Sequence, residues 1–406
     1  MTNTMKLPMK PKLLTLLFLL LPGLLAADAR QIDDYRWEGV ERVVAVGDIH
    51  GDFANYMATL RAAGLVDDKG KWAGGKTHLV QVGDLPDRGP DTREIIEHIR
   101  KLTKQAGRKG GRVHSLIGNH EVMNVTGDLR YVHPGEYQAF VDRRSDWLRD
   151  RYFEAYMERL RQQDPESYAA LPGDFRDNWE KEHPLGWLEH RQAWDPRWHE
   201  DPELAEWVMT LRVAIRINDT LFVHGGISAE YCANTLESLT EAAVEKLADY
   251  DPNDAGILED PKGPFWYRGL SGGKPRALPE TVAAILEQQE ISRIVVGHTP
   301  TPGVVWPEFD GRVVVIDTGI AGYYGGYPAY LEITPSSVLA GYPEGELPLP
   351  ANDADRVAYL EELIRMQPDN EKLKQRLERL QQAPEPAGEA AGAEEPPEPA
   401  LICGSS

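Results

Sequence analysis

One pattern recurs between residues 42 and 318 and restricts the folds that this 406-residue chain can adopt. Short runs rich in apolar and β-branched residues end abruptly at a glycine or at a polar side chain that can bind a metal. Continuous apolar runs of this length are typical of strands buried on both faces. The predicted strands are Arg42–Val46, Thr77–Val82, Arg112–Ile117, Leu211–Ile217, Thr220–Val223, Arg293–Val296 and Arg312–Ile316.

Stretches with helical character separate several of these runs. Phe53–Ala63, Pro90–Gln105 and Pro279–Gln289 are predicted helices, and the last two have proline in the first turn. The alternation of strand, loop and helix indicates a layered α/β fold. Because ligands in such folds bind at the carboxyl ends of the strands, the polar side chains there are predicted to share one site.

Six side chains at these strand ends are candidate metal ligands. Their oxygen and imidazole donors suit Mn, Fe or Zn. Six donors exceed what one catalytic ion with an open position needs, and they suit two divalent metal ions that share a carboxylate. Asp84 comes from a central run and is the expected bridge. The candidates are Asp48, His50, Asp84, Asn119, His224 and His298.

The neighbours of these ligands indicate hydrolysis of a phosphate ester. A water that bridges two such ions loses a proton near neutral pH and is the expected nucleophile. His120, next to Asn119, is the candidate general acid, and Asp87 is expected to hold its imidazole in the protonated form. Arg88 is a candidate clamp for phosphate oxygens, and Arg268 is a second candidate.

These motifs carry a resemblance to a known family. Gly47–Asp52, Gly83–Gly89, Gly118–Glu121, His224–Gly226 and Gly297–His298, in this order, resemble the calcineurin-like metallophosphoesterase superfamily. Within it, Asp87–Gly89 and Gly118–Glu121 resemble the phosphoprotein phosphatase branch. The continuation to Val132 resembles the bacterial Shewanella-like protein phosphatases, and the similarity covers residues 41–335.

The resemblance implies a calcineurin-like β-sandwich flanked by helices in α-β-β-α order, with phosphomonoesterase activity on phosphoproteins. By motif match, Asp48, His50 and Asp84 would bind one metal, and Asp84, Asn119, His224 and His298 would bind the other. His120 and Asp87 match the family's acid pair, and Arg88 and Arg268 match its phosphate clamps.

Two departures limit what the resemblance implies. Pro86 stands where eukaryotic members usually have valine, and Asp317–Gly326 replaces their loop after the last strand. Toxin sensitivity and binding of regulatory subunits are therefore not expected to carry over. Tyr323 or Tyr324 is expected to face the phosphate, with no basis for choosing between them. Asp317 is not included in the predicted site, because Asp-Thr-Gly also makes a good turn.

Composition excludes some partners. Forty-four Lys+Arg against 65 Asp+Glu give a formal charge of −21, which argues against non-specific nucleic-acid binding and adhesion to anionic membranes. The expected substrate, a phosphorylated protein or a small phosphomonoester, must therefore meet a local positive field. Cys232 and Cys403 are too few for a disulfide framework or a cysteine-rich zinc site. Cys232 is expected to be a small buried residue.

The amino-terminal end is predicted to direct the chain out of the cytoplasm. Residues 1–29 resemble a signal peptide, with three lysines, the apolar run Leu13–Ala27 and an A-x-A cleavage site at Ala27–Ala29. The run is shorter than the roughly 20 residues that cross a bilayer. A secreted, periplasmic protein with no stable membrane span after cleavage is expected; an uncleaved membrane anchor is the alternative.

Three further segments complete the predicted organisation. The insert 126–207, charged and rich in tryptophan, is predicted to be helical. It is expected to pack on the sheet as a cap, or alternatively to roof the site and set substrate access. Residues 352–382 are predicted to form two packing helices. The acidic Pro/Ala/Glu tail, 383–406, is predicted to be disordered.

The sequence thus predicts a dimetal phosphatase that acts on phosphorylated Ser, Thr or Tyr in proteins. A nucleotide or dinucleoside-polyphosphate hydrolase is the alternative enzyme. An inactive phosphatase fold that serves as an envelope adaptor is the alternative of another class, and it is disfavoured because no ligand position is substituted.

Overall fold

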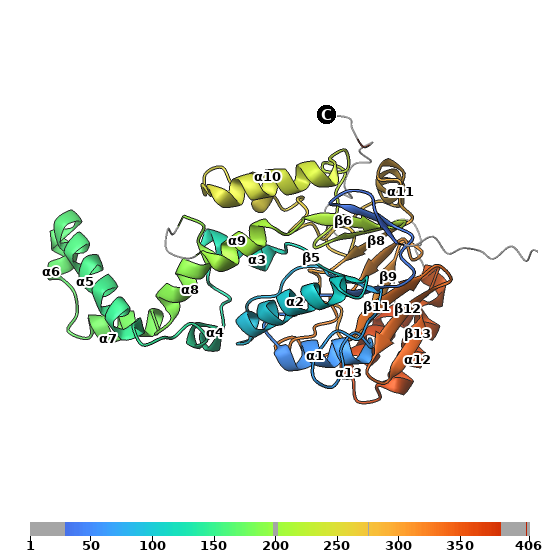
Figure 1. Cartoon of the computed structure of the whole chain (residues 1–406), viewed down its shortest axis with the longest axis horizontal. Coiled ribbons are helices and arrows are strands. Elements are labelled where there is room, and N and C mark those ends of the chain that lie inside the picture. Colours follow the sequence, from blue (N-terminus) through green and yellow to red (C-terminus); the bar gives the residue numbers. More distant parts are fainter. Residues whose placement is uncertain (1–28, 198–201, 275, 383–402, 404–406) are drawn as a thin grey trace, which may run out of the picture.

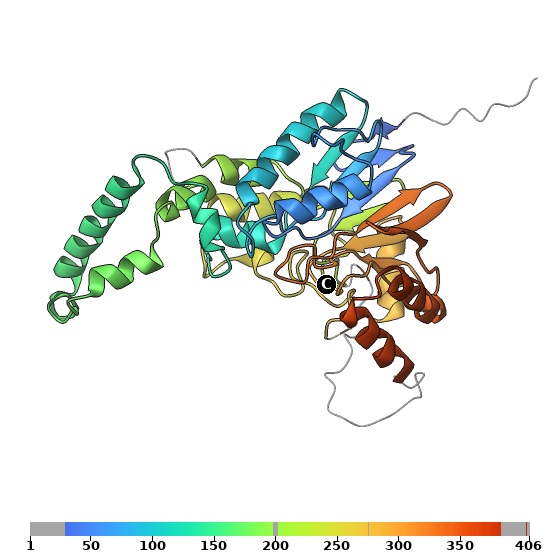
Figure 2. The same ribbon diagram turned by 90° about the horizontal axis from the view of Figure 1, so that it is seen from below.

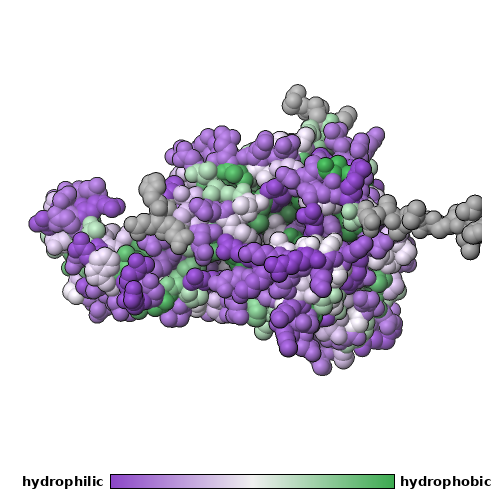
Figure 3. Space-filling view, in the orientation of Figure 1, coloured by the Kyte–Doolittle hydropathy of each residue, from purple (hydrophilic) through white to green (hydrophobic). Residues whose placement is uncertain are grey.

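The computed structural model describes residues 29–197, 202–274, 276–382 and 403. The predicted signal peptide and acidic tail lie outside these ranges, apart from Ala29 and Cys403. No helix in the described ranges is long and apolar enough to cross a bilayer. Two β-sheets with helices on their outer faces form the body of the molecule (Figure 1). The face seen in Figure 3 is mainly hydrophilic, as the high content of charged residues predicts.

The first sheet has seven strands: β1 (Arg30–Gln31), β2 (Arg36–Glu38), β6 (Ala214–Ile217), β7 (Thr220–Val223), β8 (Arg293–Val296), β9 (Trp306–Glu308) and β10 (Val313–Val315). Their order is β1-β2-β6-β7-β8-β10-β9. β7, β8 and β10 are parallel neighbours, whereas β6 and β7 form an antiparallel hairpin. Every residue of β7 and β10 is buried, as their continuous apolar sequences predict.

The second sheet has six strands: β3 (Val43–Val46), β4 (His78–Gln81), β5 (Arg112–Ser115), β11 (Tyr330–Thr334), β12 (Ser337–Tyr342) and β13 (Gly345–Pro348). Their order is β13-β12-β11-β3-β4-β5. β3, β4 and β5 are parallel, and the antiparallel meander β11–β13 extends the sheet from β3. The sheet thus continues past residue 335, where the resemblance drawn from the motifs ends.

Helices cover both sheets and confirm the predicted fold class. α1 (Phe53–Ala62) and α2 (Thr92–Gly107) lie beside the second sheet, and α2 packs on β5. α10 (Leu236–Ala248), joined by the short helix η1 (Gly256–Leu258), packs on β6 of the first sheet. α3 (Asn119–Thr126) follows β5, and α11 (Pro279–Gln288) leads into β8.

The insert is helical, and part of it leaves the body. Its helices are α4 (Pro134–Gln138), α5 (Ser145–Gln163), α6 (Pro165–Ala169), α7 (Phe175–Glu182), α8 (Trp187–Trp194) and α9 (Glu203–Met209). Figures 1 and 2 show α5, α6 and α7 extending away from the sheets, which differs from the expected cap. The arm has packing of its own: Phe153 of α5 contacts Trp179 of α7 with ring centroids 4.9 Å apart, and Trp179 is buried within the arm, although Trp147 remains exposed.

The carboxy-terminal helices pack on the body. After η2 (Asp353–Asp355) come α12 (Arg356–Met366) and α13 (Glu371–Gln382), and Leu360, Leu363 and Leu373 are buried. Lys372 Nζ donates to the carbonyl of Tyr324 at 2.9 Å. These helices therefore support the loop that follows β10.

A disulfide corrects the expectation for the cysteines. Cys232 is buried as predicted, but it is bonded to Cys403 with the two Cα atoms 5.6 Å apart. The partners are 171 positions apart, so no local pattern pairs them.

Candidate metal centre

The structure gathers the six candidate ligands at one edge of the two sheets. They come from the carboxyl ends of β3, β4, β7 and β8 and from the first residue of α3. Each is at most 5% exposed: Asp48, His50, Asp84, His224, His298 and Asn119. Neighbouring parallel strands end at the same edge, so residues up to 250 positions apart become neighbours.

The loops that carry these side chains are strained. Nine non-glycine residues of the described ranges have a positive φ, which is uncommon for L-residues. Five of them are predicted site residues: His50 (48°), Asp84 (60°), Asp87 (74°), Arg88 (66°) and His298 (65°). Such conformations persist only where the surrounding structure holds them, and they concentrate at functional sites.

Asp84 lies at the centre of the cluster. Its Oδ2 is 3.8 Å from His50 Nε2 and 3.9 Å from His120 Nε2, and its Oδ1 is 3.4 Å from His224 Nε2. Burial alone would raise the pKa of Asp84, but the histidines around it hold that pKa well below its ordinary value. One carboxylate thus faces both halves of the site.

His224 and His298 form the second half with Asn119. His224 Nε2 is 2.9 Å from Asn119 Oδ1 and 3.2 Å from His298 Nδ1. Two groups of three side chains could each hold a metal, because one ligand atom from every member lies within 4.8 Å of those of the other two. The groups are His50, Asp84 and His120, and Asp84, His224 and His298. Asp84 belongs to both groups, as a bridging ligand would.

The histidine rings are oriented as metal ligands require. His224 Nδ1 lies 3.0 Å from the carbonyl of Val82, and His50 Nδ1 lies 3.1 Å from that of Pro86. In the neutral tautomer that donates this N–H to the carbonyl, the Nε2 of each ring is free to bind a metal on the side of Asp84. Burial lowers the pKa of His50 to about 3 and that of His298 well below its ordinary value, so both stay neutral. This donor set fits two divalent cations.

Asp48 joins the two halves. Both of its carboxylate oxygens accept from the backbone N–H of His298 at 3.1 Å, and its Oδ2 is 3.9 Å from His50 Nε2. Burial, then Asp317 and Asp84, raise the pKa of Asp48 well above its ordinary value. A cluster of buried carboxyl groups with raised pKa values is one that cations would stabilise.

Glycines make room for these carboxylates. A Cβ on Gly118 would lie 2.3 Å from Asp84 Oδ1, and a Cβ on Gly297 would lie 2.3 Å from Asp48 Oδ1. No real Cβ contact is that short, so neither position accepts a larger residue unless the site moves. The glycines of the strand-end pattern therefore let the backbone lie close to the carboxylates of Asp84 and Asp48.

His120 and Asp87 form a buried pair beside Asp84. His120 Nδ1 is 2.5 Å from Asp87 Oδ2, and Asn124 Nδ2 donates to Asp87 Oδ1 at 3.0 Å. Burial would lower the pKa of His120, but Asp84 and Asp87 outweigh it and raise that pKa to about 9. The imidazole is therefore held protonated at neutral pH, with Nε2 on the side of Asp84.

Glu121 ties the loops together. Its carboxylate accepts from the backbone N–H groups of Asp84, Leu85 and Gly118 at 2.9, 2.7 and 2.7 Å. Burial, then Asp84, raise its pKa to about 7. Glu121 thus fixes the loop after β4 against the start of α3.

Arg88 lies between two tyrosines. Its guanidinium carbon is 3.8 Å from the ring centroid of Tyr131 and 4.7 Å from that of Tyr323. One guanidinium N–H donates to Tyr323 Oη at 3.1 Å, and the Tyr131 ring also lies 5.4 Å from that of His120. Tyr324 instead packs on His50, with centroids 5.1 Å apart. The structure thereby separates the two tyrosines that the sequence left equivalent.

Arg268 is close to the cluster but partly engaged. One of its N–H groups donates to the carbonyl of His298 at 2.7 Å and to Thr299 Oγ1 at 3.0 Å. Its charge lowers the pKa of His298, after the larger effects of burial and His224. Arg268 therefore adds positive charge beside His298 and Asp48.

Sequence reasoning did not assign two residues that the structure places here. Asp317 is 1% exposed at the end of β10, and burial raises its pKa to about 7. Its position at a strand end was the available signal. Tyr131 lies within the quoted Gly118–Val132 stretch, but its ring contact with Arg88 depends on the path of the insert.

Comparisons with known proteins agree with this geometry. The family model described as calcineurin-like phosphoesterase matches residues 41–302. An uncharacterized protein of Schizosaccharomyces pombe is 33% identical over 302 residues, which cover 72% of this chain and 77% of that protein. Shewanella-like protein phosphatase 2 of Arabidopsis thaliana is 30% identical over 315 residues, covering 73% and 76%.

A solved structure is also similar. The cold-active protein-tyrosine phosphatase of a psychrophilic Shewanella species superposes with a TM-score of 0.59 at 27% identity, covering 79% of this chain and 83% of that one. These relatives confirm the resemblance drawn from the motifs.

Proposed function

Because the chain belongs to the calcineurin-like phosphoesterase family and is a metallophosphoesterase, we propose that it removes phosphate from proteins, with phosphotyrosine as the preferred residue. The observation that carries this proposal is the His120–Asp87 pair, 2.5 Å apart and buried, beside a ligand cluster and an arginine held between tyrosines. A proton donor and an anion clamp on one side of a metal site suit ester cleavage with an oxygen leaving group.

Two divalent cations of Mn, Fe or Zn would be held by the clustered side chains, with Asp84 shared. Asp48, His50 and Asp84 would serve one, and Asp84, Asn119, His224 and His298 the other. When bound, such ions supply Lewis acidity toward phosphoryl oxygens and lower the pKa of coordinated water. Their charge also offsets the buried carboxyl groups of Asp48, Asp84 and Asp317.

The chain's own residues would handle the leaving group. His120 Nε2 would give its proton to the ester oxygen as the bond to phosphorus breaks, while Asp87 Oδ2 keeps accepting from Nδ1–H. The raised pKa of His120 keeps it loaded with this proton at neutral pH. Asn124, bonded to Asp87, holds the carboxylate in place.

The surroundings of Arg88 favour an aromatic ester. Its guanidinium can present two N–H groups in one plane to phosphate oxygens, and stacking between Tyr131 and Tyr323 fixes that plane. Tyr323 is 63% exposed, so its ring is available to a substrate ring. A protein whose name includes tyrosine phosphatase among the similar structures supports this choice.

Phosphate release from three substrates tests the proposal. Two peptides with one flanking sequence, one with phosphotyrosine and one with phosphoserine, are compared with a dinucleoside polyphosphate, using Mn, Fe or Zn in turn. We expect the phosphotyrosine peptide to have the highest kcat/KM, and Asp84→Asn and His120→Asn to abolish turnover. Asp68→Asn makes the same chemical change at an exposed loop and should leave turnover intact.

Other outcomes would favour the alternatives. Preferential cleavage of the dinucleoside polyphosphate would identify a nucleotide hydrolase instead. Wild-type protein that binds two ions per chain but releases no phosphate from any substrate would identify the adaptor.

We also propose that the protein works in an oxidising compartment outside the cytoplasm. The Cys232–Cys403 disulfide supports this location, because such bonds persist mainly in secreted and periplasmic proteins. Fractionation of a Gram-negative host that expresses the whole chain, with sequencing of the mature amino terminus, is the test. Protein found only in the cytoplasm with reduced cysteines would contradict it.

A further inference from the structure

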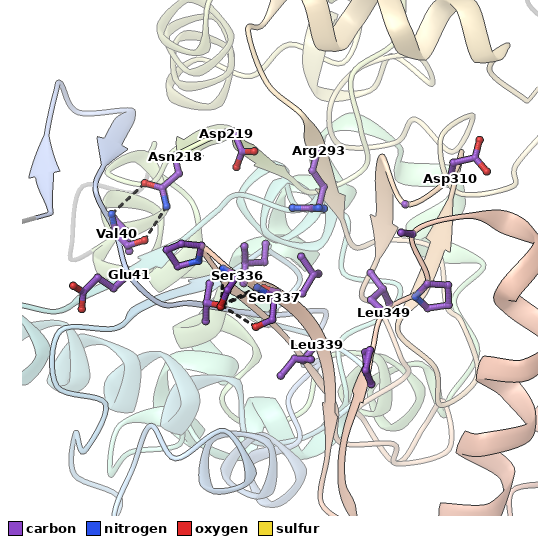
Figure 4. Close-up of a pocket in the computed structure, with 18 of the residues that line it drawn as sticks. Val40, Glu41, Asn218, Asp219, Arg293, Asp310, Ser336, Ser337, Leu339 and Leu349 are labelled. Carbon is purple, nitrogen blue, oxygen red and sulfur yellow. Dashed lines mark hydrogen bonds between the residues drawn. The ribbon is translucent and has the colours of Figure 1, made fainter. Parts of the chain in front are cut away.

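A cavity lies at the end of the sandwich opposite the metal centre. Its volume is about 860 Å³, within the range of small-molecule sites. It opens between the two sheets, beside the β6–β7 and β11–β12 turns and the first residue of β8 (Figure 4). β8 begins here with Arg293 and leads to His298 of the metal centre, so the two sites are about 16 Å apart along this strand.

Arg293 makes no direct ion pair or side-chain hydrogen bond with any residue that the structure describes, although the carboxylate of Asp219 lies near enough to favour its charged form. Its side chain is half-buried, its Nε is buried without a hydrogen bond, and its guanidinium forms no ion pair within the described ranges. Figure 4 shows the side chain reaching into the cavity. Burial lowers the pKa of Arg293, and the nearby carboxylate of Asp219 offsets this effect only in part. An unpaired, partly desolvated guanidinium is costly unless an anion binds it.

The rest of the lining limits what that anion can be. Ile333, Val338, Leu339 and Leu349 give the cavity apolar walls. The polar groups of the walls are already bonded to each other: Asn218 binds both backbone groups of Val40, as the dashed lines in Figure 4 show. The walls therefore suit a hydrocarbon body, and a peptide backbone would find few partners.

The charges at the rim refine the choice. Glu41, Asp219 and Asp310 are exposed around the opening, so the cavity with Arg293 carries a formal −2. The negative rim would repel a phosphate dianion about twice as strongly as a carboxylate monoanion. The two oxygens of one carboxylate can also accept two parallel N–H groups of one guanidinium. We propose that this inter-sheet cavity is a binding site for a monocarboxylate with an apolar body, of the class of medium-chain fatty acids, and that Arg293 binds its carboxylate.

Calorimetric titration with octanoate and octanamide tests the assignment. The two probes share the hydrocarbon chain and differ in charge. We expect octanoate to bind the unmodified, metal-free protein at least about tenfold more tightly than octanamide, as one charge-assisted bidentate contact implies. Metal-free protein is used so that a carboxylate cannot bind at a cation.

Variants locate the contact. Arg293→Gln should weaken octanoate binding at least about tenfold and leave octanamide within about twofold. Arg112→Gln makes the same change at the exposed first residue of β5, outside the cavity, and should bind both probes like the wild type. Val338→Glu in the apolar wall should weaken both probes.

Several results would overturn the proposal. These are no octanoate binding up to its solubility limit, equal affinity for the two probes, or an unchanged octanoate affinity in Arg293→Gln. If that variant does not fold, the comparison of the two probes on the unmodified protein still decides. None of these measurements uses phosphatase activity, so the outcome is independent of the proposed function.

Discussion

Replacing Asp87 by asparagine isolates the electrostatic part of the proposed proton donor. The asparagine side chain keeps the size of the aspartate and tolerates the positive φ of this position, 74°. The change removes a negative charge 2.5 Å from His120 Nδ1 in a buried setting. Asp84 and Asp87 together raise the pKa of His120 to about 9 against the opposing effect of burial, so the loss of one carboxylate must lower it.

The sign and size of the effect follow from this pair. The protonated form of His120 is the proposed acid, so activity is lost as pH rises through its pKa. Because a nearby opposite charge moves a pKa by about 1–3 units, the alkaline limb of kcat should move down by about 1–3 pH units in Asp87→Asn. Wild type and variant are compared with the same metal, so the contribution of the cations largely cancels.

The assay is kcat against pH with phenyl phosphate and p-nitrophenyl phosphate. Phenolate is the poorer leaving group and needs the proton more, so plateau kcat should fall about tenfold or more for phenyl phosphate and less for the nitrophenyl ester. Asp68→Asn is the matched control. An alkaline limb that stays in place, with equal losses on both esters, would refute the assignment of Asp87 as the residue that tunes His120.

Three further predictions address the metals, the clamp and the disulfide. Mn²⁺ at about 100 times its Kd should raise the calorimetric Tm of the wild type by roughly 3–4 °C. Asp84→Asn lacks the shared ligand, so Mn²⁺ should hardly change its Tm, and its metal content should be low. Tyr131→Leu should raise KM for the phosphotyrosine peptide about 5- to 30-fold, because Arg88 loses the ring that it stacks on. Tyr131→Phe keeps that ring and should keep the wild-type KM. Equal KM values in the two variants would rule out the clamp. Cys403→Ser should lower the free energy of unfolding by up to about 5 kcal/mol, because the disulfide closes a loop of 171 residues, and chemical denaturation of oxidised and reduced protein measures it. An unchanged denaturation midpoint would show that the disulfide does not stabilise the fold by restricting the unfolded chain.

The predicted strands were those with continuous apolar sequences. β3, β7 and β8 occur where their runs predict them, since a strand covered on both faces needs apolar side chains throughout. The strands β11–β13 and the short β1, β2 and β9 were not predicted. Their burial is mixed or their length is two or three residues, so their sequences resemble those of loops.

The insert and the cysteines show where local patterns fail. Its helices were predictable from composition and periodicity, but the contacts by which α5 packs on α7 join residues more than 20 positions apart and form only in the folded chain. The disulfide joins residues whose neighbourhood is created only when the chain folds.

By itself, the sequence determined the chemistry of the candidate centre: which donors stand at strand ends, and that Asn119, His120 and Glu121 follow one another. Parallel strands bring their carboxyl ends to one edge, so residue order along the chain becomes proximity in space. Only the tertiary structure decided that Asp84 faces both halves, that Tyr131 and Tyr323 hold Arg88, and that an arginine without an ion-pair partner in the described ranges lies between the sheets. Those facts rest on angles and distances between segments that no short stretch of sequence encodes.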